Sequence, residues 1–209
     1  MPAEPSVDIA VFARAPIAGQ AKTRLIPRLG ASGAARLQRQ LTERSLARAR
    51  SVRGARVTLW TTVDDAEARA LADAARASVR LQRGNDLGAR MSNAFAETLD
   101  GNRPMLLIGT DCPAQTVADL ETAVTALQEA DAVIQPAEDG GYVLIGMKRS
   151  HPVLFEQVAW GSATVLAATR ARAAEHRVRL AELPTCWDLD RGEDLDRALA
   201  LGLVDLPAE

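Results

Sequence analysis

The chain has 209 residues, with 25 Lys and Arg against 27 Asp and Glu, which gives a formal net charge of −2 at pH 7. Because charges of both signs are interspersed, the composition offers no electrostatic basis for binding nucleic acid or an anionic membrane. No apolar run is long enough to span a bilayer, and the first residues lack the cationic and apolar regions of a signal peptide, so a cytoplasmic protein is expected. The two cysteines, Cys112 and Cys186, are too few and too poorly spaced for a disulfide framework or a cysteine zinc site.

Strand and helix patterns alternate along nearly the whole chain. In chain order they predict a strand at 7–13, a helix at 31–52, a strand at 57–62, a helix at 64–77, a strand at 79–82, a helix at 87–99, a strand at 105–109, a helix that begins with Thr116 and Asp119 in capping-box register, strands at 132–136 and 142–147, helices at 151–157 and 162–176, a strand at 178–183 and a helix from 193. Such alternation predicts an α/β fold, a three-layer α/β/α sandwich with a mostly parallel central sheet. No linker, repeat or low-complexity segment divides the chain, so residues 1–209 are expected to form one domain.

The loop after the first predicted strand is cationic. Pro16 and Gly19 punctuate a turn there, and Lys22 and Arg24 follow. Arg presents a planar fork of donors to phosphate oxygens, whereas Lys presents a compact charge. Ligands of open α/β sheets bind beyond the carboxyl ends of the strands, so this loop is predicted to hold phosphate. The alternative is a solvated cationic surface loop.

Two carboxylates follow later strands. Asp111 stands in a Gly-Thr-Asp-Cys-Pro turn at the end of the fourth predicted strand, where a carboxylate can bind a hard divalent cation; its alternative is a turn or N-cap aspartate. Asp139 precedes Gly140 and Gly141, which let a ligand approach the backbone; its alternative is a simple Asp-Gly hairpin turn. Cys112 is interpreted as a small buried residue rather than a nucleophile, because no histidine is near it in the sequence.

A further acidic stretch precedes the last predicted helix. Asp188 and Asp190 alternate in an extended segment, which would place both side chains on one face. Asp194 or Glu193 is expected to serve the N-terminus of the helix instead.

Two tryptophans flank predicted loops, and a serine stands near the start of a predicted helix. Whether Trp160 or Trp187 lines the site is left open. Ser162 is expected to cap the helix that follows it.

Taken together, these loops resemble those of a bacterial family. The segments that carry the resemblance are 12–25, 82–91, 109–113, 136–146, 160–162 and 187–195. They are similar to a glycosyltransferase-like family of the GT-A (nucleotide-diphospho-sugar transferase) superfamily, and the match spans almost the entire chain. The 16–25 segment also resembles the opening loop of phospholactate guanylyltransferases, and Asp111 with Pro113 resembles the aspartate and proline of molybdenum-cofactor nucleotidyltransferases.

The resemblance implies a role for each segment. It implies catalytic roles for Lys22, Arg24 and Asp111, and Mg²⁺ (or Mn²⁺) bound by Asp111 and Asp190. It implies a nucleotide bound by Ala13, Arg14, Gly19, Lys22, Arg24, Gln82, Asp86, Gly88 and Arg90. It implies a second, small-molecule substrate that meets Asp139, Gly140, Gly141 and Tyr142.

Two departures from the relatives bear on the reaction. The Gly-Gly-x-Gly-x-Arg opening of sugar nucleotidyltransferases is missing, and the Asp-x-Asp pair usual in GT-A glycosyltransferases is reduced to Asp111 alone. Lys22 and Arg24 could neutralise a triphosphate, which favours an Mg-dependent nucleotidyltransferase that joins an NTP to a small phosphorylated substrate and releases pyrophosphate. The alternative is a glycosyltransferase that uses an NDP-sugar, with Asp139 as the base, and a second alternative is a non-catalytic nucleotide-binding module.

The sequence leaves several points open. They are the second substrate, the nucleobase, the oligomeric state, and the choice between Asp188 and Asp190 as the second metal ligand. Asp111 is expected to lie at the carboxyl edge of the sheet and to face the loop of residues 15–24. Clustered carboxylates repel one another when no cation is bound, so replacing Asp111 or Asp190 by Asn is expected to keep or raise the stability of the free protein.

Replacing Arg24 by Ala should weaken nucleotide binding strongly and leave the fold intact, because a loop arginine makes few core contacts. Lys at this position should rescue binding poorly, since an ammonium group cannot reproduce the bidentate grip of a guanidinium. Thermal-shift titrations with nucleotide and Mg²⁺ compare both variants with the wild type. Unchanged nucleotide affinity in the Ala variant would return this loop to the solvated-surface interpretation.

Overall fold

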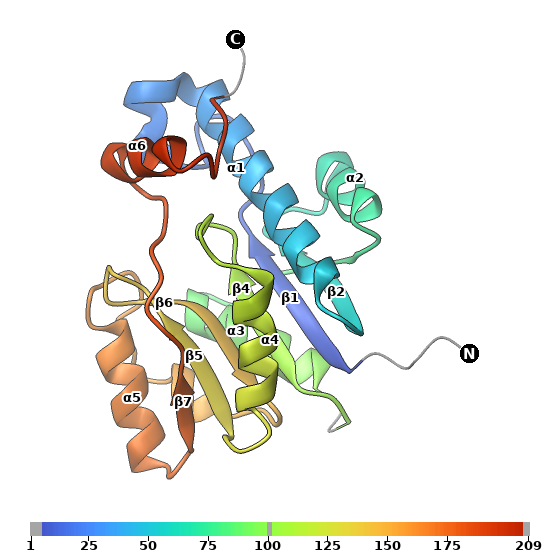
Figure 1. Cartoon of the computed structure of the whole chain (residues 1–209), viewed down its shortest axis with the longest axis vertical. Coiled ribbons are helices and arrows are strands. Elements are labelled where there is room, and N and C mark those ends of the chain that lie inside the picture. The colour runs from blue at the N-terminus through green and yellow to red at the C-terminus, as the bar shows by residue number, and fades with distance from the viewer. Residues whose placement is uncertain (1–5, 100–101, 207–209) are drawn as a thin grey trace.

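The computed structural model describes residues 6–99 and 102–206, and its centre is a seven-stranded sheet (Figure 1). In chain order the strands are β1 (Val7–Ala13), β2 (Ala55–Thr61), β3 (Ser78–Leu81), β4 (Met105–Gly109), β5 (Ala132–Pro136), β6 (Tyr142–Met147) and β7 (Leu180–Glu182). Their order across the sheet is β3-β2-β1-β4-β6-β5-β7. Neighbouring strands are parallel except at β6, which runs antiparallel to both β4 and β5. The predicted mostly parallel sheet is confirmed.

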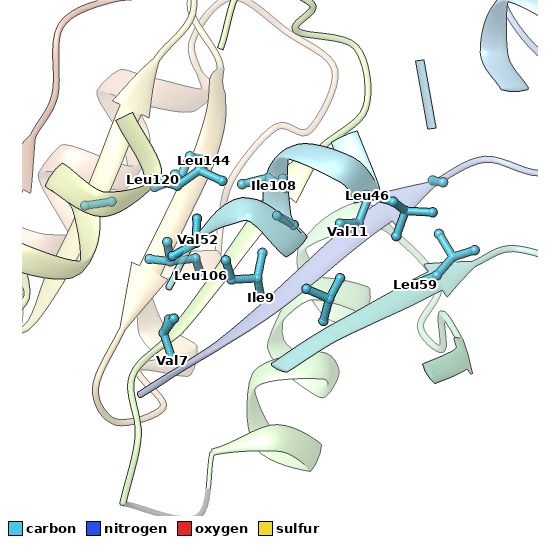
Figure 2. Packing of buried hydrophobic residues seen from close by; sticks show 14 of the residues in the cluster. Val7, Ile9, Val11, Leu46, Val52, Leu59, Leu106, Ile108, Leu120 and Leu144 are labelled. Carbon is cyan, nitrogen blue, oxygen red and sulfur yellow. The ribbon is translucent and has the colours of Figure 1, made fainter. Parts of the chain in front are cut away.

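Burial on both faces explains why β1 is almost entirely apolar. All seven of its residues are buried, and successive side chains point to opposite sides of the sheet. Ile9 and Val11 belong to the cluster shown in Figure 2, whereas Ala10 and Phe12 belong to a second cluster on the other face. The core is therefore divided in two by the sheet.

Helices cover both faces and make the sheet the middle of three layers (Figure 1). On one face, α1 (Ile26–Ser51), α2 (Ala66–Ala74) and α4 (Val117–Ala126) enclose the cluster of Figure 2. On the other face lie α3 (Leu87–Thr98), the 3₁₀ segment η2 (Pro152–Phe155) and α5 (Val165–Glu175). The predicted three-layer sandwich is confirmed. Within the described ranges, no helix combines the length and apolar character that crossing a bilayer requires.

The last helix, α6 (Gly192–Ala200), packs beside the beginning of α1 (Figure 1). Leu195 and Ala198 of α6 share a buried cluster with Leu37 of α1. Arg28 Nη1 lies 2.7 Å from Asp196 Oδ2 and adds an exposed ion pair between the two helices. This packing holds the segment that precedes α6 close to the loop after β1.

Two predicted helices differ from the observed ones. α1 begins at Ile26, five residues earlier than predicted, and Gly30 interrupts it with a φ of 67° that is not helical. The helix predicted at 151–157 is only the short 3₁₀ segment η2, in which proline occupies the first position.

Helix N-termini show one correct and one wrong capping prediction. At α4, Asp119 N donates to Thr116 Oγ1 at 3.2 Å and Thr116 N donates to Asp119 Oδ2 at 2.8 Å, so the capping box is confirmed. At α5 the N-cap is Thr164, without a side-chain capping bond, and Ser162 Oγ donates to the carbonyl of Ala159 instead. The prediction for Ser162 is wrong because the chain makes one more turn before α5 begins.

Candidate functional site

A cavity of about 570 Å³ lies at the carboxyl ends of β1 and β4. Its charged lining comes from the loop after β1, the turn after β4, the β5–β6 turn and the segment before α6. The charged side chains are Arg14, Lys22, Arg24, Asp111, Asp139, Asp188 and Asp190. Asp111 therefore shares an edge of the sheet with the 15–24 loop, as the sequence predicts.

Lys22 is the buried member of this charged set. Its side chain is 4% exposed, and its Nζ lies 2.8 Å from Asp111 Oδ1. The same ammonium group donates to the carbonyl oxygen of Leu189 at 2.5 Å. The backbone of Lys22 has φ 46° and ψ 45°, a left-handed conformation that residues other than glycine rarely adopt. This turn directs the side chain inward, where its charge meets a carboxylate and a carbonyl.

Asp111 is anchored through its backbone and a buried neighbour. Leu189 N donates to the carbonyl oxygen of Asp111 at 2.7 Å. Thr110 Oγ1 lies 3.3 Å from Asp111 Oδ1 and itself accepts from Gln38 Nε2 of α1 at 3.0 Å. The Asp111 side chain is still 53% exposed, so it can meet a ligand in the cavity. The N-cap interpretation of Asp111 is wrong, because Thr116 caps α4.

A second ion pair of the cavity joins Arg24 to Asp190. Both side chains are exposed, at 65% and 41%, so the pair adds little to stability. At the N-terminus of α6, Asp194 Oδ2 accepts from the backbone amides of Asp190 at 3.0 Å and of Arg191 at 2.6 Å. Of the two candidates, Asp194 and Glu193, it is Asp194 that serves this helix end. The Asp190 side chain is thereby left to line the cavity.

Asp188 lies among other negative charges. Burial, followed by the charge of Asp139, raises the pKa of Asp188 to about 6, and Asp111 and Asp190 act in the same direction. The cavity wall holds four carboxylates against three cationic side chains. A bound cation would therefore lower the electrostatic energy of this site.

The β5–β6 turn combines a carboxylate with two glycines. Asp139 Oδ1 accepts from Gly141 N at 2.8 Å, so this carboxylate closes its own turn while it also lines the cavity. Gly140 has a φ of 87°, and a Cβ there would lie 2.2 Å from the carbonyl oxygen of Ala163. Only glycine allows these two segments of the chain to approach so closely.

Aromatic rings form part of the wall. Tyr142 and Trp160 both line the cavity and meet edge to face, with ring centroids 6.3 Å apart. The Tyr142 hydroxyl is buried, and this burial raises the pKa of the hydroxyl above its ordinary range. The ring, rather than the hydroxyl, is therefore available to a second substrate. Trp187 is 6% exposed and stacks under Arg197, whose guanidinium lies 4.3 Å from the ring centroid, so of the two loop tryptophans Trp160 is the one that faces the cavity.

Several predicted binding residues do not line this cavity. They are Ala13, Gly19, Gln82, Asp86, Gly88, Arg90 and Gly140. Gln82 Nε2 donates to the carbonyl of Ala13 at 3.1 Å, and Asp86 is the N-cap of α3. Gly88 lies against the indole of Trp160, where a Cβ would come within 2.3 Å of Nε1. The observed contacts of these three residues are with the protein itself, and nucleotide binding by them stays a prediction.

Two further positions of this set, Gly19 and Arg90, are parts of turns. Gly19 has a φ of 81° in the loop after β1, a conformation that glycine adopts without strain. Arg90 Nε donates to the carbonyl of Gly84 at 3.1 Å, so the guanidinium braces the loop before α3. Their predicted contacts with nucleotide are likewise untested.

An apolar wall completes the cavity, and sequence reasoning missed its residues except Trp160, whose place was left open. Phe12, Leu87, Met91, Leu107 and Trp160 form this wall. Phe12 of β1 and Leu107 of β4 point to the face of the sheet that α3 covers, and Met91 comes from α3 itself. In the sequence they have the ordinary pattern of core residues, and only Leu87, at 45% exposure, is unusually open for a large apolar side chain.

Comparison with known proteins assigns the family. A family model described as an uncharacterized protein conserved in bacteria (DUF2064) matches residues 45–162. The chain belongs to this family. A solved structure from Desulfovibrio desulfuricans G20, provisionally named a nucleotide-diphospho-sugar transferase, is 32% identical in sequence, with a TM-score of 0.84 over 93% of this chain and 86% of its own. The chain therefore has the nucleotide-diphospho-sugar transferase fold.

More distant structures share the fold. CMP:2-keto-3-deoxy-manno-octonic acid synthetase, solved with CTP, is 12% identical, with a TM-score of 0.59 over 94% of this chain and 98% of its own. A Mycobacterium tuberculosis H37Rv protein solved with manganese is 19% identical, with a TM-score of 0.57 over 93% of this chain and 98% of its own. No curated protein matches the chain.

Removing the carboxylate partner of the buried Lys22 should destabilise the protein, which reverses the expectation drawn from the sequence. In the free protein, Asp111→Asn should lower the free energy of unfolding by roughly 1 kcal/mol, because the ammonium group keeps only neutral acceptors. Asp190→Asn is the matched control, and it should cost less than about 0.5 kcal/mol because its partner Arg24 is exposed. Urea denaturation without metal or nucleotide measures both. Equal stability of wild type and Asp111→Asn would mean that the Lys22 charge does not depend on this carboxylate.

Removing the charge of Asp188 should stabilise the protein by an amount that depends on pH. Its pKa in the folded protein, about 6, lies above the ordinary value of 3.8, so the folded state holds the proton to higher pH than the unfolded state. The stability contributed by this group therefore falls as pH rises from about 4 to about 6, and it stays low above that range. Asp188→Asn should raise the free energy of unfolding at pH 7.5 by roughly 1 kcal/mol, a figure already reduced for partial solvent exposure.

Urea denaturation at several pH values tests the effect of Asp188→Asn. The difference between variant and wild type should be near zero at about pH 4 and should reach its full size above about pH 6. A difference that is independent of pH would attribute the effect to packing rather than to charge.

Proposed function

We propose that this chain is a metal-dependent nucleotidyltransferase that joins an NTP to a small phosphorylated substrate and releases pyrophosphate. The observation that carries the proposal is the pairing of Lys22 with Asp111 and of Arg24 with Asp190 on one side of the cavity. Two cations suited to phosphate and two carboxylates suited to a divalent cation meet there. The provisional name of the Desulfovibrio relative and the CTP complex of a protein with the same fold support a nucleotide-containing substrate.

The donor set fits Mg²⁺ or Mn²⁺ bound together with phosphates. Across residues 6–99 and 102–206, no group of three or more His, Cys, Asp or Glu is arranged to hold a metal alone. Mg²⁺, however, is usually bound by one or two carboxylates and completes its shell with substrate phosphates and water. Asp111, with Asp188 or Asp190, would hold the cation. Burial, and then the negative charges of Asp139, Asp111 and Asp190, raise the pKa of Asp188. The manganese complex of a protein with this fold is consistent with this choice of metal.

Binding would exchange the partners of the two ion pairs. In the free protein Lys22 and Arg24 neutralise Asp111 and Asp190. A cation–triphosphate ligand carries both signs of charge, so the carboxylates can turn to the cation while Lys22 and Arg24 turn to phosphate oxygens. Each charge keeps an opposite partner, and no charge is left uncompensated in the low-dielectric site. The ion pairs of the free protein are therefore compatible with the predicted roles.

The reaction needs little covalent chemistry from the protein. A phosphate oxygen of the second substrate would attack the α-phosphorus of the NTP, a phosphoanhydride bond would form, and the bond to pyrophosphate would break. Lys22 and Arg24 would stabilise the charge that develops on the departing pyrophosphate, and a cation held by Asp111 with Asp188 or Asp190 would supply further neutralisation. A phosphate nucleophile is already ionised near neutral pH, so no general base is required. The absence of histidine from the lining residues is in keeping with this chemistry.

The rest of the cavity suits the two organic parts of the substrates. The apolar wall, with Trp160 and Leu87, offers a surface for a base or for an apolar part of the second substrate. Asp139 and Gly141 lie on the β5–β6 turn, where they could meet polar groups of that substrate.

Glycosyl transfer from an NDP-sugar is the second candidate. The name of the Desulfovibrio relative favours it, and Asp139 lines the cavity where an acceptor hydroxyl would need a base. Asp139 Oδ1 accepts a hydrogen bond from Gly141 N, so this oxygen is already engaged in the turn. A non-catalytic nucleotide-binding module would need the same binding groups without turnover.

A ligand screen tests the proposal. Each NTP and each common NDP-sugar is added with Mg²⁺ or Mn²⁺, and the melting temperature is recorded. One NTP at about 100 times its dissociation constant should add ~2.7 kcal/mol, a rise of roughly 5–10 °C for a domain of this size. The shift should require the divalent cation.

Turnover is measured next, as pyrophosphate release with phosphorylated small molecules. Stabilisation only by an NDP-sugar, with sugar transfer and no pyrophosphate, would support the glycosyltransferase. Tight NTP binding without any turnover would support the non-catalytic module, and no response to any nucleotide would overturn the proposal.

A further inference from the structure

The two cysteines of the chain meet beside the cavity although 74 positions separate them. Cys112 Sγ and Cys186 Sγ lie 2.9 Å apart, and both are free thiols. Cys112 follows Asp111 in the turn after β4, and Cys186 stands in the segment between β7 and α6 (Figure 1). The spacing in the sequence gives no sign of this contact.

Backbone hydrogen bonds hold the Cys186 segment in place. Cys186 N donates to the carbonyl of Pro136 at 2.9 Å, and Glu138 N donates to the carbonyl of Cys186 at 3.0 Å. Three residues further on, Leu189 N donates to the carbonyl of Asp111. The segment is thus bonded both to the end of β5 and to the turn that carries Cys112. The contact between the sulfurs follows from the fold.

The two thiols lie in a small, mostly apolar environment. Ala137 and Val143 pack around the two sulfurs as a small apolar cluster. Among the described residues, no set of three His, Cys, Asp or Glu could use these thiols to hold a metal ion. Cys112 is 2% exposed, whereas Cys186 is half-buried and can be reached from solvent.

We propose that Cys112 and Cys186 are a redox modification site, at which peroxide forms a reversible disulfide. The Cys186 sulfur attacks hydrogen peroxide to give a sulfenic acid and water, and the Cys112 thiol then displaces a second water to form the S–S bond. In sum, two thiols and one peroxide give one disulfide and two waters, and a dithiol reverses the reaction by exchange. A disulfide needs the sulfurs about 2.05 Å apart, so the thiols have to approach by less than about 1 Å.

The bond would tie two parts of the cavity together. Cys112 adjoins Asp111, and Cys186 lies two positions before Asp188. Oxidation would therefore lock the segment that bears Asp188 and Asp190 onto the turn that bears Asp111. This inference does not depend on the proposed reaction, because it rests on the sulfur contact alone.

Mass spectrometry after peroxide treatment tests the site directly. The oxidised protein should lose about 2 Da, the mass of two hydrogen atoms, and dithiothreitol should restore it. Tryptic digestion without reductant should link the peptide of residues 91–148 to that of residues 180–191, since these contain the two cysteines. Cys186→Ser and Cys112→Ser should show neither the loss nor the link. A gain of oxygen without a link, or disulfides only between molecules, would overturn the proposal.

Measurements of stability and of amide hydrogen exchange test whether oxidation fixes these two segments together. Closing a loop of this length should raise the melting temperature of the oxidised wild type by about 5–10 °C over the reduced form. Amide exchange in residues 184–190 should slow on oxidation. Cys186→Ser, treated in the same way, is the control and should show neither change. An internal disulfide that leaves both measurements unaltered would overturn the proposed lock.

Discussion

The geometry of the site depends on the two interactions that the ammonium group of Lys22 makes. This group is nearly excluded from solvent, and it bonds at once to the Asp111 carboxylate and to the carbonyl of Leu189. These two partners belong to the turn after β4 and to the segment before α6, so one charge joins both to the loop after β1. Without the carboxylate, the buried ammonium group would keep only neutral acceptors, so the ion pair favours the arrangement in which the three segments meet.

The balance of charge then explains how the same residues can be neutralised both in the free protein and with a ligand bound. Lys22 and Arg24 each compensate one carboxylate, whereas Asp188 has its pKa raised by burial and by its acidic neighbours. A site with surplus carboxylates and two phosphate-binding cations is prepared for a ligand that brings both a cation and phosphates. The apolar wall behind it offers a place for the uncharged part of such a ligand.

Side chains near the cavity divide into those that face it and those that shape it. Gln82 and Asp86 bond to backbone, and Gly88 makes room for Trp160. Tyr142 lines the cavity with its ring but buries its hydroxyl. Residue type alone does not distinguish these uses, because an amide or a carboxylate that caps a helix looks the same in a sequence as one that binds a ligand.

The sequence by itself determined the layers, the mostly parallel sheet and the edge at which Asp111 and the cationic loop meet. These features follow from local periodicity and from the rule that parallel strands end at one edge, and both can be read from neighbouring residues. Only the tertiary structure decided that Lys22 is buried against Asp111, that Arg24 pairs with Asp190, and that two distant thiols touch. Partners of this kind are set by how α6 and its preceding segment pack on α1 and β4. The free energy of a long-range contact depends on burial and on the chain that surrounds it, and no spacing in the sequence encodes either.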